Sequence, residues 1–238
     1  MAVSHPVLSP RALHVLSRPL GANAYEQSMV AHAWQLLSAE ERQRAVARHG
    51  DRLRNDFIVT RGAVRMLLSQ YLQNTPPHAI QFVTSPQGKP SLDPVAHPNA
   101  PSFSVSHCAD LLLVGVAHAG QAFGIDVEPL KTVSDDVLAR EVLAPREYDD
   151  CSATAMSRRG SKFLYYWTRK EAYLKAVGTG LIDSLATIDT SQQEVRVCDR
   201  PTGLFCSDLQ VGAGHRAAFS SRDPLEVTRL SIASTSSV

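Results

Sequence analysis

The chain has 238 residues, of which 44% are hydrophobic and 20% are charged, and its formal net charge is +1. A chain of this length buries about 70% of the surface that it exposes when unfolded, so its hydrophobic core alone can hold it folded. The near-neutral charge excludes bulk attraction to nucleic acid or to an anionic membrane, and any anion that the protein binds must be met by a local group of cations.

The N-terminal segment and the cysteines indicate where the protein resides. Residues 1–20 lack the continuous apolar run of about 7–15 residues that a signal peptide has, and no later apolar stretch approaches the roughly 18 residues that span a bilayer. The four cysteines form no CxxC pair and show no regular spacing, so they predict neither a zinc site nor a disulfide framework. We therefore expect free thiols and a cytoplasmic protein.

A strand and two helices are predicted at the start of the chain. Residues 11–20 alternate well enough for a strand, and residues 28–37 have the apolar spacing of a helix. Ser38 lies three residues before Glu41, which is the capping-box arrangement that begins a helix. This second helix is expected to stop at Gly50.

A longer amphipathic helix and an irregular segment come next. Residues 54–72 place apolar side chains on one stripe and Arg54, Arg61 and Arg65 near another face. The pattern alone indicates that these arginines are solvated. Residues 74–101 are rich in Pro, Asn, Ser and Gly, a composition typical of turns and loops.

Three runs in the middle of the chain read as strands: SFSVSH (102–107), LLLVGVAHA (111–119) and FGIDVEPL (123–130). Each is short and rich in β-branched or other apolar residues. Only three residues separate the first run from the second, so we expect these two strands to form a hairpin.

Helical spacing returns in the second half of the chain. It covers residues 144–151 and residues 161–180, and the longer helix is expected to stop at Gly178 and Gly180. Residues 185–221 then read as short strands with turns. Helices and strands thus come in two rounds, which predicts the α+β class with two comparable halves, 1–122 and 123–238.

Two carboxylates stand in the third strand run. Asp126 and Glu128 are two positions apart, so they project from one face of a strand, while Ile125 and Val127 project from the opposite, apolar face. Neighbouring carboxylates repel unless one is protonated or a cation lies between them. Because the donors are oxygens, a hard ion such as Mg²⁺ is favoured over zinc. The alternative is a strand end whose acids simply face water.

The run WTRKEAYLKAVGTGL adds a third acid and two lysines. Glu171 and Lys175 are four residues apart and share a helix face, on which Trp167 lies one turn earlier. One reading is that Glu171 and Lys175 form only an ion pair along the helix. The other is that Glu171 completes a three-carboxylate metal site while Lys170 and Lys175 bind phosphate oxygens. Sequence spacing leaves both readings open.

Two further segments carry polar groups that suit an anion. Ser106 and His107 are adjacent on a strand and point to opposite faces, and the chain has no GxSxG motif, so they do not predict a hydrolase dyad. His107 is better read as a hydrogen-bond donor to an anion or as a buried histidine. Lys89 lies in QGKP, a loop whose glycine lets a phosphate approach closely, although the full phosphate-loop motif is missing.

Taken in order, GKP, FSVSH, FGIDVEP and WTRKEAYLKAVGTGL resemble the phosphopantetheinyl transferases, specifically the long, single-chain type that activates synthetases of secondary metabolism. The resemblance spans residues 10–220 and rests mainly on GIDVE and WxxKEAxxK. It implies two similar α+β halves related by a pseudo-twofold axis, with coenzyme A in the cleft between them, and a monomeric protein.

The resemblance also implies roles for individual residues. Those that match the family's magnesium ligands are Asp126, Glu128 and Glu171. Those that match its coenzyme A contacts are Lys89, Ser106, His107, Lys170 and Lys175, and either Arg54 or Arg61 supplies a first-half cation. Thr179 departs from the family, since some relatives have lysine between the two glycines, and this puts a minor phosphate or carrier contact in doubt.

The implied reaction is Mg²⁺-dependent transfer of 4'-phosphopantetheine from coenzyme A to a serine of an apo acyl or peptidyl carrier protein, with release of 3',5'-ADP. In this interpretation Glu171 and Lys175 are the catalytic residues, and the nucleophile belongs to the partner. Coenzyme A and the carrier are then the partners, with no nucleic acid and no membrane. Two alternatives use the same residues: a metal-dependent phosphodiester hydrolase and a non-catalytic coenzyme A-binding protein.

Overall fold

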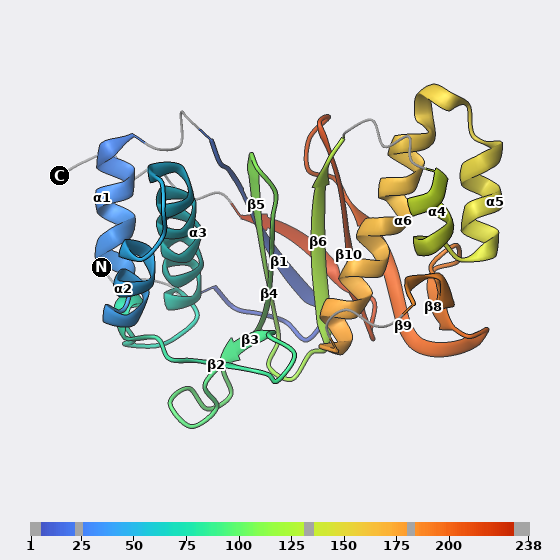
Figure 1. Ribbon diagram of the computed structural model, residues 1–238. Coiled ribbons are helices and arrows are strands. Elements are labelled where there is room, and N and C mark those ends of the chain that lie inside the picture. Colours follow the sequence, from blue (N-terminus) through green and yellow to red (C-terminus); the bar gives the residue numbers. More distant parts are fainter. Residues whose placement is uncertain (1–5, 22–25, 131–135, 180–183, 231–238) are drawn as a thin grey trace.

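Two large β-sheets lie side by side, and helices cover the outer face of each (Figure 1). The computed structural model describes residues 6–21, 26–130, 136–179 and 184–230. This arrangement confirms the predicted α+β class. The expected boundary at residue 122 falls between the first sheet's β5 (Leu111–Ala117) and the second sheet's β6 (Phe123–Pro129).

The first sheet has the strand order β11-β1-β5-β4. Its other strands are β1 (Ala12–Pro19), β4 (Ser102–His107) and β11 (Glu226–Leu230). β4 and β5 form the predicted antiparallel hairpin. β11 comes from the far end of the described chain and pairs in parallel with β1.

Three helices cover the outer face of the first sheet (Figure 1). They are α1 (Gln27–Leu36), α2 (Ala39–Val46) and α3 (Asp51–Ser69). The expected capping box is present between Ser38 and Glu41. The predicted stop at Gly50 is wrong: α2 ends at Val46, and Gly50, at φ +88°, is the residue before α3. This left-handed backbone, which suits glycine, turns the chain into α3.

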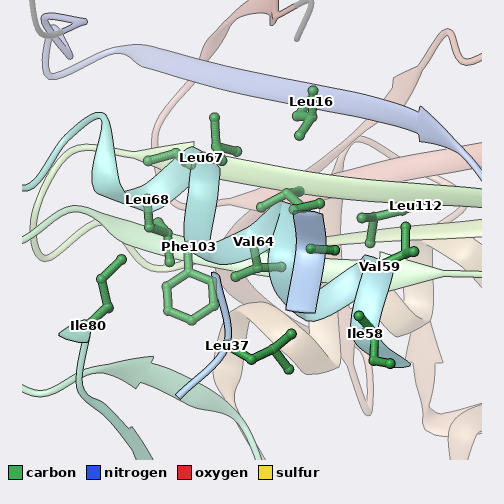
Figure 2. Packing of buried hydrophobic residues seen from close by; sticks show 14 of the residues in the cluster. Leu16, Leu37, Ile58, Val59, Val64, Leu67, Leu68, Ile80, Phe103 and Leu112 are labelled. Carbon is green, nitrogen blue, oxygen red and sulfur yellow. The ribbon is translucent and has the colours of Figure 1, made fainter. Parts of the chain in front are cut away.

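A dense apolar core lies between α3 and the first sheet. Figure 2 shows Val59, Val64 and Leu67 of α3 among side chains from the strands, including Leu16 and Phe103. The apolar stripe that the sequence places along this helix therefore packs against the sheet. The following segment carries a short 3₁₀ helix, Pro77–Ala79, and a small hairpin of β2 (Phe82–Thr84) and β3 (Pro90–Leu92).

The second sheet has the order β6-β10-β9-β8-β7. Its other strands are β7 (Ile188–Asp189), β8 (Glu194–Val197), β9 (Arg200–Leu209) and β10 (His215–Ser221), and a 3₁₀ helix, Leu185–Thr187, precedes β7. Leu13 and Leu113 of the first sheet share one buried core with Ile125, Val127 and Phe219 of the second. The two sheets therefore pack against each other.

The long helix α6 (Met156–Val177) packs on the outer face of β6 and β10 (Figure 1). It begins five residues before the predicted 161 and ends at Gly178, whose left-handed φ of +79° caps it as expected. Gly180 lies outside the described residues. Two shorter helices, α4 (Asp136–Val142) and α5 (Pro145–Ala153), lie beyond α6; the sequence predicted α5 but not α4.

The structure also bears on the predicted free thiols and on the search for a membrane-spanning segment. All four cysteines are free thiols, as predicted. In the part of the chain that the structure describes, no helix is both long enough and apolar enough to cross a bilayer.

Candidate functional site

The two sheets meet where β4 lies beside β6. β6 is the edge strand of its sheet, and its outward-facing backbone N–H groups need acceptors. The N–H of Ile125 donates to Ser104 Oγ at 3.1 Å, and the N–H of Val127 donates to Ser106 Oγ at 3.3 Å. Serine hydroxyls of β4 thus take the place of a neighbouring strand, and they fix β4 against β6.

Asp126 is the centre of a buried polar group on β6. Its Oδ1 accepts hydrogen bonds from Ser106 Oγ at 2.8 Å and from Lys175 Nζ at 2.7 Å. Lys175 Nζ also donates to Ser106 Oγ at 2.9 Å, so the three side chains contact one another. Asp126 Oδ2 is buried and has no hydrogen-bond partner among the described residues. A buried carboxylate oxygen without a donor is suited to a cation.

Gly124 lets α6 come close enough for this contact. A Cβ at Gly124 would lie 2.3 Å from the carbonyl oxygen of Ala172 and 2.5 Å from the backbone nitrogen of Ala176, both on α6. Only glycine allows such an approach of helix and strand backbones. A glycine inside an apolar strand is the sequence signal for this role, which was not among the sequence-based predictions. The close approach brings Lys175 within reach of Asp126.

Of the two other acids, Glu128 on β6 faces α6, and Glu171 belongs to α6 itself. Trp167 Nε1 of α6 donates to Glu128 Oε1 at 3.3 Å, so Asp126 and Glu128 project from the same face of β6, as their spacing predicts. Burial raises the pKa of Glu171, and the negative charges of Asp126 and Glu128 raise it further, against the opposing effect of Lys175. The three carboxylates therefore interact electrostatically.

The carboxylate oxygens of Asp126, Glu128 and Glu171 are farther apart than the ligand atoms of a single metal ion. Among the described residues, Cys108, Asp110 and His215 form the group of potential ligands whose donor atoms all lie within 4.8 Å of one another. Asp126, Glu128 and Glu171 do not form such a group. A bound ion would have to draw their oxygens together.

A pocket of about 290 Å³ opens beside this group. Its lining includes Ser104 of β4, Glu171 and Lys175 of α6, and Gly88 and Lys89 of the loop before β3. Lys89 Nζ donates to the carbonyl oxygens of Phe123 and Lys175, and burial lowers the pKa of Lys89. The loop is thereby tied to both β6 and the end of α6.

His107 lies on the other side of β4 from Ser106, as the alternation of the strand predicts. Burial lowers the pKa of His107, and the positive charges of Lys175 and Arg48 lower it further, whereas Asp56 of α3 raises it. The imidazole is therefore within electrostatic range of the Asp126 group and of α3.

The second half of the chain matches a known family. A profile of the 4'-phosphopantetheinyl transferase superfamily matches residues 122–221, which contain β6, α6 and all three carboxylates. Residues 122–221 are therefore similar to the 4'-phosphopantetheinyl transferase superfamily.

Several curated proteins of this superfamily are similar to the chain. The 4'-phosphopantetheinyl transferase HetI of a Nostoc species is 36% identical, with 61% of this chain and 61% of HetI covered. A putative 4'-phosphopantetheinyl transferase of a Synechocystis species is 32% identical, with 63% and 60% covered. The chain therefore aligns with less than two thirds of either relative's length. The 4'-phosphopantetheinyl transferase gsp of Aneurinibacillus migulanus is 26% identical, with 84% and 86% covered.

One similar solved structure is the holo-[acyl-carrier-protein] synthase of Thermotoga maritima. It has a TM-score of 0.32 and 20% sequence identity to this chain. The match covers 42% of this chain and 61% of that chain.

Three residues expected to bind the ligand of a phosphopantetheinyl transferase lie away from the pocket. Lys170 is fully buried, and its Nζ lies 2.7 Å from Glu147 Oε2. Arg61 donates to Glu41 Oε1 at 2.8 Å, and Arg54 pairs with Asp51 on the surface. We leave these three out of the site proposed below.

One first-half arginine that the sequence did not single out acts electrostatically on His107. Arg48, in the short connection between α2 and α3, is the arginine whose charge acts on His107. Its guanidinium also lies over the ring of Phe57, 4.4 Å from the centroid, which holds the side chain against α3. The helix expected to stop at Gly50 included Arg48, but its pattern gave no indication that this side chain interacts with His107.

Proposed function

We propose that the chain transfers the 4'-phosphopantetheine group of coenzyme A to a serine hydroxyl of an apo acyl or peptidyl carrier protein and releases 3',5'-ADP. The observation that carries this proposal is Asp126, whose buried, unpartnered Oδ2 lies beside Lys175 in the region that matches the superfamily. An unpartnered acid oxygen, a lysine and a pocket together suit a substrate that carries a diphosphate and a divalent cation.

The residues present fit Mg²⁺. The donor set is made of oxygens, which a hard cation prefers, and Asp126 Oδ2 is free to accept it while Oδ1 is held by Lys175 and Ser106. Asp126 and Glu128 would hold the ion, with Glu171 at its edge. When bound, it supplies positive charge to the diphosphate oxygens of coenzyme A.

Glu171 is the proposed general base. Its pKa is raised toward the working pH by burial and by the neighbouring acids, which is the property that a general base requires. It takes the proton of the carrier's serine as the serine oxygen forms its bond to the β-phosphorus. The bond from that phosphorus to the bridging oxygen breaks, and 3',5'-ADP leaves with the electron pair. Lys175 donates to the oxygens on which negative charge grows.

Polar and cationic groups of the first half position the nucleotide end of coenzyme A. His107 and Arg48 would meet its phosphate groups, and Ser106 holds Asp126 and Lys175 in place. Lys89 keeps its loop closed over the pocket through its two carbonyl contacts. Arg48, Lys89 and Lys175 supply the local positive charge that the chain's net charge of +1 does not.

The test is to incubate the chain with coenzyme A, Mg²⁺ and an apo carrier protein and to measure the carrier's intact mass. A gain of one phosphopantetheine, lost when the carrier's serine is changed to alanine, supports the proposal. Release of 3',5'-ADP with an unmodified carrier would identify a phosphodiester hydrolase instead. Binding of coenzyme A with neither product would identify a non-catalytic binding protein.

A further inference from the structure

Cys108, Asp110 and His215 come together at a second place where the two sheets meet. Cys108 and Asp110 belong to the turn between β4 and β5, and His215 is the first residue of β10. Cys108 Sγ lies 3.2 Å from Asp110 Oδ1, and His215 Nε2 lies 2.9 Å from the same oxygen. The three donor atoms all lie within 4.8 Å of one another, and no other group of described residues meets this condition.

The donors are of the kinds that zinc selects. Thiolate sulfur, imidazole nitrogen and carboxylate oxygen bind Zn²⁺ at about 2.3, 2.0 and 2.1 Å, respectively. These lengths and a tetrahedral angle place pairs of ligand atoms about 3.4–3.6 Å apart. The present separations of 2.9 and 3.2 Å are shorter by roughly half an ångström, so a small outward movement of the side chains admits the ion.

We propose that Cys108, Asp110 and His215 hold one Zn²⁺ ion, with water as the fourth ligand. The group lies at the surface, with Asp110 exposed and the other two half-buried, so an ion and its water can enter. On binding, the thiol proton of Cys108 is released to solvent, and His215 coordinates through Nε2 with its ring proton on Nδ1. The soft sulfur donor distinguishes this site from the oxygen-only acids around Asp126, which suit Mg²⁺.

The ion would join two segments that are far apart in sequence. Asp110 and His215 are separated by 105 residues, and they belong to different sheets. Cys108 directly follows His107, so the ion would fix the end of β4 against the start of β10. A ligand that binds only the folded chain raises its thermal midpoint, and this effect gives a readout independent of any enzymatic activity.

Cobalt provides the direct test, because Co²⁺ occupies zinc sites and a thiolate ligand gives a charge-transfer band in the near ultraviolet. The full chain without an affinity tag, in excess Mg²⁺, should bind one Co²⁺ with this band, and Zn²⁺ should remove it. Cys108→Ser should abolish the band. Cys198→Ser, which changes an exposed thiol elsewhere, should retain it. Absence of the band from the unchanged chain, or its persistence in Cys108→Ser, would overturn the proposal.

Two milder variants and a thermal scan complete the test. His215→Gln and Asp110→Asn should each weaken Zn²⁺ binding by at least about tenfold, since even outer-shell changes at metal sites have effects of that size. Zn²⁺ should raise the thermal midpoint of the unchanged chain and of Cys198→Ser, but not that of His215→Gln. An equal rise in all three would show that the ion binds elsewhere and would refute the site.

Discussion

Lys175 of α6 contacts Asp126 of β6, with Nζ 2.7 Å from Oδ1, across a junction that Gly124 makes possible. The contact leaves the second carboxylate oxygen of Asp126 buried without a partner. Asp126 and Lys175 thus define the centre of the proposed site together with Gly124. This glycine carries no charge and contributes only by letting the helix approach the strand.

Gly124→Ala should disrupt this junction. The new Cβ would lie 2.3 Å from a backbone oxygen of α6, which cannot move aside as a flexible side chain does. We expect the free energy of unfolding to fall by about 1–3 kcal/mol, the usual result of overpacking, and the transfer rate to fall with it. Urea unfolding and the carrier mass assay measure the two effects. Gly214→Ala is the matched control, because nothing lies within 4 Å of its added Cβ.

Replacing Glu171 tests its proposed role as the base. Glu171→Gln keeps the size of the side chain but cannot accept the serine proton, so kcat should fall by about 10²–10⁴-fold. The apparent affinity for coenzyme A should change far less. If turnover and its metal dependence stayed near normal, another group would have to be the base.

Arg48 should contribute to binding of coenzyme A more than other surface arginines do. Arg48→Gln removes the first-half charge that acts on His107, and we expect KM for coenzyme A to rise by about tenfold, the loss of one charge-assisted hydrogen bond. Arg44→Gln makes the same charge change on the exposed side of α2 and serves as the control. Equal effects of the two variants would indicate only general electrostatic attraction, against a specific role for Arg48.

Glu41 should make the stability of the first half sensitive to acid. Burial alone would raise the pKa of Glu41, but hydrogen bonds and charge from Arg65 and Arg61 outweigh it and lower the pKa below 4.5. A carboxylate with a depressed pKa stabilises the fold above its unfolded pKa and loses that contribution as pH falls through its folded pKa. The free energy of unfolding should therefore decline as pH falls below 4.5.

Glu41→Gln provides the comparison at neutral pH. Loss of the Glu41 carboxylate leaves the buried guanidinium of Arg65 without its ion-pair partner. We therefore expect the free energy of unfolding at pH 7 to fall by about 3–5 kcal/mol. The variant should also lose less further stability on acidification than the unchanged chain does. Parallel pH profiles for the two proteins would show that the acid sensitivity arises elsewhere.

Local periodicity predicted most of the strands and helices and the common face of Asp126 and Glu128. Alternation along β6 fixes which side chains meet α6, since Ile125 and Val127 are needed in the core between the sheets. The same reasoning, applied to the helical periodicity of α6, could have shown that its two lysines point in different directions. Lys175 is one turn from Glu171, whereas Lys170 lies five residues away from Lys175, about 140° around the helix, and points at Glu147.

Features set by tertiary contact could not be predicted in this way. The spacing of the cysteines indicated no zinc site because His215 joins Cys108 and Asp110 only through the packing of two sheets. Arg48 was missed because its interaction with His107 depends on the tertiary packing of the first half. Gly124 did carry a signal, but its meaning depends on how closely a later helix packs on the strand.

The parallel pairing of β11 with β1 has a consequence for synthesis on the ribosome. β1 emerges early, yet its neighbour, residues 226–230, emerges after all the other described strands. Until then one edge of the first sheet presents unpaired backbone groups, which favour pairing with other chains. Until residues 226–230 have emerged, the nascent protein is thus exposed to misassembly at this edge, and the pairing of β11 with β1 closes it.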